Sequence, residues 1–100
     1  MSAVQAVRDY YALMDAGRIE EGFARLSPAY RERTGEGSYR AFWQTIAGVE
    51  VLDARSDELV VDATLRYTRT DGTTSTEAVI LRFIRDPSTG ALLIDDYRLR

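Results

Sequence analysis

Residues Glu58 to Arg85 read ELVVDATLRYTRTDGTTSTEAVILRFIR, and the fold can be worked out from this stretch. Apolar and polar residues alternate through its first half, which is the period of a strand with one buried face. The second half also alternates, although both of its faces carry apolar residues. Asp71-Gly72 between the two halves is a strong hairpin signal, because a type I′ turn needs positive φ at both central residues. The stretch therefore predicts two long antiparallel strands joined by a tight turn.

Four strands are expected in total. The predicted ranges are Val49 to Ala54, Glu58 to Thr70, Thr73 to Arg85 and Ala91 to Leu99, with a longer turn over residues 86–90. Apolar side chains of the return strand point to both faces, with Val79, Leu81 and Phe83 on one and Ala78, Ile80 and Ile84 on the other. We therefore expect helices on one face of the sheet and partial cover of the other by a partner subunit or by the curl of the sheet.

The residues before Gly48 have helical spacing instead. Ser2 is expected to cap a helix over Ala3 to Ala16 that stops at Gly17, and apolar spacing predicts a second helix from Arg18 to Leu26. Ser27 and Pro28 predict the first turn of a short third helix, Pro28 to Arg33.

A fourth helix is expected after a flexible loop over residues 34–37. Ser38 is its predicted cap, Tyr39, Phe42, Trp43 and Ile46 form its apolar stripe, and Gly48 is its predicted end. The sequence therefore predicts a single α+β domain over residues 1–100. Three to four N-terminal helices would pack on a bent antiparallel sheet of about four strands.

Composition excludes several classes of chemistry. The chain contains no cysteine and no histidine, which removes thiol chemistry, thiolate metal sites and the commonest general base near neutral pH. Its thirteen basic residues are all arginine and are spread along the chain, and the net charge is −3, so no nucleic-acid partner is expected.

No apolar run is long enough to cross a bilayer, and Met1 to Gln5 do not resemble a signal peptide. We expect a soluble chain without membrane insertion.

Several stretches resemble the nuclear transport factor 2-like superfamily of cone-shaped domains. Those that carry the resemblance are Val7 to Leu13 with Leu26-Ser27-Pro28, Ser38 to Trp43, Tyr67 to Gly72, and Leu92 to Tyr97. Within the superfamily the chain looks like the small domains at the extracytoplasmic end of actinobacterial serine/threonine kinases. The resemblance implies the cone fold, a homodimer formed through the sheet and, if the domain belongs to such a receptor, an extracytoplasmic location.

The leading functional hypothesis is a non-enzymatic domain that binds a small apolar ligand or a protein partner as a sensor, with no cofactor, metal or catalytic residue. Two alternatives remain. One is a small enzyme similar to ketosteroid isomerase or epoxide hydrolase, which uses tyrosine and aspartate inside the cone. The other is an engineered scaffold of this fold, since the regular caps and the Asp-Gly hairpin are compatible with design.

Tyr11, Trp43 and Tyr67, together with Phe42, are the candidate ligand-binding residues. Large aromatic side chains also dominate the core of a small domain, so ordinary core packing is the competing interpretation.

For an enzyme, the candidate acids and bases are Tyr10, Tyr11, Asp15, Tyr67, Asp95 and Asp96. Asp95 and Asp96 are adjacent on a strand and point to opposite faces, so they form a poor carboxylate pair. Solvated or arginine-paired carboxylates are the default interpretation. The arginines of the hairpin are likewise expected to be solvated or paired with carboxylates, and an anion-binding patch is the alternative interpretation. These arginines are Arg66, Arg69, Arg82 and Arg85.

Overall fold

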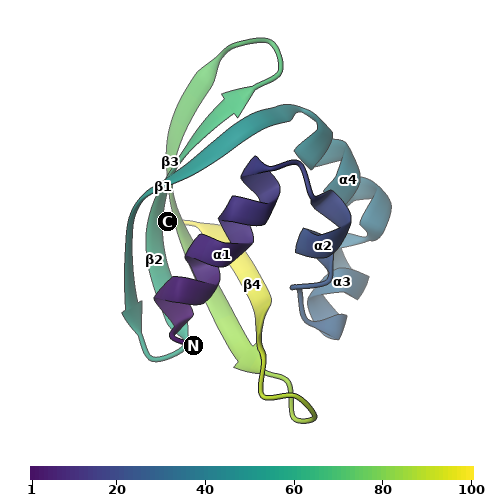
Figure 1. The fold of residues 1–100 in the computed structure, drawn as a ribbon, viewed down its shortest axis with the longest axis vertical. Helices are drawn as coiled ribbons and strands as arrows, with labels where there is room; N and C mark the ends of the chain where they lie inside the picture. The colour runs from purple at the N-terminus through teal and green to yellow at the C-terminus, as the bar shows by residue number, and fades with distance from the viewer.

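Helices form the first half of the chain and strands the second (Figure 1). The computed structural model describes all 100 residues. The helices are α1 (Ala3–Asp15), α2 (Ile19–Phe23), α3 (Pro28–Thr34) and α4 (Glu36–Gln44). The strands are β1 (Ile46–Asp57), β2 (Val60–Arg69), β3 (Thr74–Arg85) and β4 (Leu92–Leu99). The strands form one antiparallel sheet in the order β1-β2-β3-β4, so the predicted α+β class is confirmed.

The sheet bends around the helices. Helix α1 crosses its concave side, and α2, α3 and α4 lie beside α1 (Figure 1). The pairing register shifts between Val51 and Asp53 of β1. It shifts again in β4, opposite Arg82 and Phe83 of β3, and both shifts mark bulges. A bulge bends its strand and increases the local twist, which helps the sheet to curl. The inner face joins α1 in one apolar core, in which Val7, Val61 and Val79 are completely buried.

The first and third helices begin as the sequence predicts. The Ser2 hydroxyl accepts a hydrogen bond from the Gln5 amide (3.1 Å), and the Ser27 hydroxyl accepts one from the Tyr30 amide (3.1 Å). Each bond satisfies an amide that has no partner inside its helix.

The fourth helix differs from the prediction at both ends. It begins at Glu36, so Ser38 lies inside the helix, and the expected loop shrinks to Gly35. Gly35 has φ 77°, a conformation in which one residue can separate two helices, and glycine adopts it without strain. The helix ends at Gln44, and Gly48 lies within β1.

Gly48 marks a close contact between α1 and the sheet. A Cβ at Gly48 would lie 3.1 Å from Asp15 Oδ1, and that oxygen accepts a hydrogen bond from the Val49 amide at 2.9 Å. The glycine therefore lets a carboxylate from the end of α1 approach the strand backbone. This contact involves residues far apart in the sequence, which local periodicity does not reveal.

The turn between β2 and β3 is a hairpin, but it is not type I′. Gly72 has φ 88°, whereas Asp71 does not have positive φ. The Gly72 amide donates to the Arg69 carbonyl (2.9 Å) and the Arg69 amide to the Thr73 carbonyl (2.8 Å), so three residues form the loop. Asp71 Oδ1 accepts hydrogen bonds from the Thr73 amide (2.9 Å) and hydroxyl (2.6 Å). These features are typical of a type I turn followed by a glycine bulge.

The chain covers the outer face of the sheet only in part. Val60 is 41% exposed and Ile84 is 36% exposed. Arg66 pairs with Glu50 on this face. The expected cover by the curl of the sheet is therefore incomplete.

Gly22 in α2 supports a specific prediction. A Cβ at this position would lie 2.1 Å from Met14 Sδ and 2.9 Å from the Tyr39 hydroxyl oxygen. Although alanine favours a helix, Gly22→Ala should destabilise the fold by about 1 to 3 kcal/mol in denaturant unfolding because it overpacks this contact. Gly37→Ala is the matched control, since a Cβ in α4 meets nothing within 4 Å and should stabilise by up to about 1 kcal/mol. Equal effects of the two substitutions would contradict this account.

Candidate functional site

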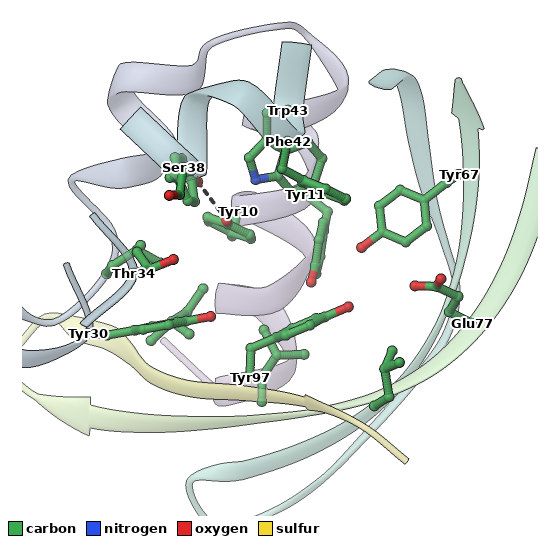
Figure 2. Close-up of a pocket in the computed structure, with 15 residues that line it drawn as sticks. Tyr10, Tyr11, Tyr30, Thr34, Ser38, Phe42, Trp43, Tyr67, Glu77 and Tyr97 are labelled. Carbon is green, nitrogen blue, oxygen red and sulfur yellow. Dashed lines mark hydrogen bonds between the residues drawn. The ribbon is translucent and has the colours of Figure 1, made fainter. Parts of the chain in front are cut away.

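A cavity of about 340 Å³ lies between the helices and the inner face of the sheet (Figure 2). It opens beside Phe42 and Leu99, whose side chains are 48% and 63% exposed. Twelve of its fifteen lining residues are hydrophobic. The lining consists of Tyr10, Tyr11, Leu26, Tyr30, Thr34, Ser38, Tyr39, Phe42, Trp43, Tyr67, Glu77, Leu81, Ile94, Tyr97 and Leu99.

All six tyrosines of the chain line this cavity. They come from α1, α3, α4, β2 and β4, so elements from both halves of the fold contribute. A tyrosine ring supplies apolar contact area, and its hydroxyl supplies a hydrogen-bonding group at the end of the side chain. The cavity is therefore apolar along its sides and has several polar points within it.

Trp43 lies at the centre of the aromatic lining. Its ring centroid lies 5.2 Å from that of Phe42 in an edge-to-face arrangement, 6.1 Å from that of Tyr67 and 6.3 Å from that of Tyr11. Such contacts are worth about 0.5–1.5 kcal/mol each beyond the area they bury. The predicted residues Tyr11, Trp43 and Tyr67 are 2%, 7% and 3% exposed, and all three line the cavity. They are thus core residues and cavity residues at once, and a ligand-binding role for them stays a prediction.

Two of the tyrosine hydroxyls bond to each other. The Tyr10 and Tyr39 oxygens lie 2.6 Å apart, and the Tyr39 hydroxyl also donates to Met14 Sδ at 3.5 Å. Because a hydroxyl has one proton, Tyr10 is then the donor in the tyrosine pair. This pair joins α1 to α4.

A second group of hydroxyls faces open space in the cavity. The hydroxyls of Tyr11, Tyr67 and Tyr97 converge there with the carboxylate of Glu77 (Figure 2). Glu77 lies in β3 opposite Leu65, on the same face as the buried residues Val79 and Leu81. It is half-buried, it forms no ion pair, and it is the only charged residue of the lining.

Burial makes these tyrosines difficult to ionise. Desolvation is the largest cause that raises the pKa of Tyr10, Tyr11 and Tyr67 far above the usual 10.0, and it raises the pKa of Tyr39 to about 12. The Glu77 carboxylate adds to the rise in the pKa of Tyr67 and Tyr97 by charge repulsion. The hydroxyls therefore remain neutral at physiological pH and can donate or accept hydrogen bonds.

None of the aspartates considered from the sequence lines the cavity. Asp15 accepts from the Val49 amide, and Asp96 lies 3.9 Å from Arg33. Asp95 accepts from the Ser27 hydroxyl (2.7 Å) and from Arg82 (3.1 Å). These contacts give all three aspartates structural partners, and Asp95 ties β4 to the start of α3.

The hairpin arginines do not gather into a patch. Arg66 pairs with Glu50 and Arg82 with Asp95, while Arg69 donates to the Ser75 hydroxyl at 2.8 Å and Arg85 to the Gly90 carbonyl at 3.3 Å. Each guanidinium therefore has its own local partner, and the alternative of an anion-binding patch has no support.

Glu77 was missed at the sequence level. It occupies the position two residues before Val79, so the alternation of β3 places it on the inner face with Val79, Leu81 and Phe83. Glu77 could have been identified from the sequence as a charged residue on the otherwise apolar face of a predicted strand. Tyr30, Tyr39 and Tyr97 were also missed as lining residues, because their convergence depends on how the helices pack on the sheet.

No group of three or more acidic, histidine or cysteine side chains is placed to hold a metal ion. None of the helices has the length and hydropathy needed to traverse a bilayer.

Comparison with known proteins adds no relative to this picture. None of the protein families compared matches the chain, and no curated protein matches it. The structure is compatible with a nuclear transport factor 2-like cone in its helices and its four-stranded antiparallel sheet.

The buried tyrosines predict alkaline unfolding. Their folded-state pKa values lie above the unfolded value of about 10, so the stability linked to them is present below pH 10 and is lost as the pH rises above it. We expect tyrosinate absorbance and circular dichroism to change together in one cooperative step above pH 10. The chain in concentrated denaturant is the control and should titrate near pH 10. Titration of Tyr10, Tyr11 and Tyr67 near pH 10 in the folded protein would contradict the burial described here.

Proposed function

We propose that this protein is a non-enzymatic ligand-binding domain that takes a small, largely apolar molecule into the tyrosine-lined cavity. The observation that carries the proposal is the cavity itself, with its volume of about 340 Å³ and its lining of aromatic and aliphatic side chains. This volume and lining are typical of small-molecule sites. Ordinary core packing would place the same aromatic residues together without leaving such a space.

The resemblance to nuclear transport factor 2-like cones fits this proposal, because the cavity lies between helices and a curled sheet. A role as a sensor in an actinobacterial signalling protein, at the extracytoplasmic end of a kinase, extends the proposal and rests on the resemblance alone. An engineered scaffold with this fold would have the same cavity, and it would bind the same class of ligand.

A homodimer formed through the sheet is a further part of the proposal. The partial exposure of Val60 and Ile84 on the outer face supports it. Charged residues such as Arg66 and Glu50 share this face, so the apolar area is interrupted. Sedimentation over a range of protein concentrations would test the dimer.

Binding can be tested with an uncharged cyclic alcohol such as 4-tert-butylcyclohexanol. Trp43 is the only tryptophan and lines the cavity, so its fluorescence should shift on binding, with a Kd on the order of 0.1 mM. Ser38→Phe adds a ring to an exposed helical position at the lining and should weaken binding by about tenfold or more. Ala29→Phe makes a similar change at an exposed position outside the lining and should bind normally. An unchanged Trp43 spectrum at millimolar alcohol would show that the cavity does not take this uncharged ligand and would count against the proposal.

The convergence of Glu77 with Tyr67 and Tyr97 supports a second candidate function, an isomerase. Glu77 would take a proton from a carbon next to a carbonyl group, and a tyrosine hydroxyl would donate a hydrogen bond to the oxygen as it gains negative charge. Glu77 would then return the proton at another carbon of the same molecule.

A β,γ-unsaturated cyclic ketone is the substrate for the test of this alternative. Formation of the conjugated isomer should be visible by ultraviolet absorbance, and Glu77→Gln should slow it by about 10²-fold or more. Glu32→Gln, an exposed position outside the cavity, is the control that should retain the rate. No conversion above the uncatalysed rate would leave the binding function as the only candidate.

A further inference from the structure

The chemistry of the cavity wall indicates the charge of the ligand, an inference that rests on the proposed binding function. We propose that the cavity selects an organic cation, an amine or quaternary ammonium group on an apolar body. The positive charge would lie beside the Glu77 carboxylate, among the rings and hydroxyls of Tyr11, Tyr67 and Tyr97.

Glu77 has no counterion. No arginine lies within ion-pair distance of its carboxylate, and it accepts no hydrogen bond. Arg69, which lies on the same side of the hairpin, donates to Ser75 instead. A half-buried carboxylate loses hydration, and a cation in the cavity would compensate for that loss.

The remaining wall of the cavity also favours positive charge. The faces of aromatic rings carry negative potential, and a cation within about 6 Å of a ring centroid is attracted to it. Tyr11, Tyr67 and Tyr97 surround the position faced by Glu77 and direct their hydroxyl oxygens toward it, and Trp43 lies next to two of these rings (Figure 2). Aromatic side chains together with a carboxylate are the type of site that recognises quaternary ammonium groups.

Anionic and neutral ligands match the cavity wall less well than a cation does. The lining contains no arginine, so an anion would find no positive partner and would be repelled by Glu77. A neutral ligand could fill the cavity but would leave the carboxylate without a partner. The tyrosine hydroxyls can accept hydrogen bonds from an ammonium N–H group.

The apolar body of the ligand also has side chains to contact. Leu26, Leu81 and Ile94 line the cavity and are almost completely buried. The exposed ring of Phe42 lies at the opening. A ligand that carries a charged group on an apolar body therefore matches both kinds of lining residue.

Three probes of similar shape test the proposal. Phenyltrimethylammonium is a cation, tert-butylbenzene is its uncharged isostere, and benzenesulfonate is an anion of related shape. We expect the cation to bind at least about tenfold more tightly than the isostere, a factor that corresponds to about 1.4 kcal/mol, and the anion not to bind. Trp43 fluorescence and calorimetric titration would give the affinities.

Glu77→Gln removes the charge and keeps the shape of the side chain. In this variant the ratio of the affinities for cation and isostere should fall to about one, whereas Glu32→Gln makes the same change in net charge outside the cavity and should keep the ratio. Circular dichroism would show that both variants fold, and Glu77→Ala would provide a second test should Glu77→Gln not fold.

The outcomes separate the two proposals. If the isostere binds and the cation binds no more tightly, the cation inference is overturned and the binding function stands. If Glu77→Gln keeps the wild-type ratio, the carboxylate is not the source of selectivity and the inference is also overturned. If none of the three probes binds and the cyclic alcohol also fails, the binding function itself is wrong.

Discussion

The contact of Trp43 with its aromatic neighbours is the interaction on which the helical layer depends. Its ring packs against Tyr11 of α1, Phe42 of its own helix and Tyr67 of β2, so one side chain joins two helices to the sheet. Rigid aromatic rings fill space efficiently when they meet edge to face, but flat rings held from several directions can leave a gap between them. The same packing that stabilises the fold therefore also forms the walls of the cavity.

The parts of the fold that local spacing controls could be predicted from the sequence. The alternation through Val61, Ala63 and Leu65 gave the inner face of β2, and the Ser2 and Ser27 caps gave the starts of two helices. The start of α4 was missed because Gly35 turns the chain in one residue, a property of its backbone angle. The position of the turn at Asp71-Gly72 was predicted correctly, but its type was not. The loop contains three residues instead of two, and loop length determines the turn type.

The candidate site was less accessible to prediction. Tyr11, Trp43 and Tyr67 stood out because large aromatic residues on apolar faces are conspicuous in a short chain. Glu77 did not, although the period of its strand placed it on the inner face. The aspartates attracted attention by their type, and the structure gives them partners such as the Val49 amide and the Ser27 hydroxyl. Strand alternation can place a carboxylate on the inner face, but whether that carboxylate reaches the cavity depends on how the helices pack on the sheet.

The single glycine between α3 and α4 has a mechanical consequence. Thr34 at the end of α3 and Phe42 in α4 both line the cavity, and one residue connects the two helices. Such a short link holds the end of α3 and the start of α4 together, so a shift of either helix at this point also moves the other. Helix α3 is anchored to β4, where Arg33 donates to the Asp95 carbonyl and Ser27 to its carboxylate. Widening the cavity for a larger ligand would therefore strain these polar contacts.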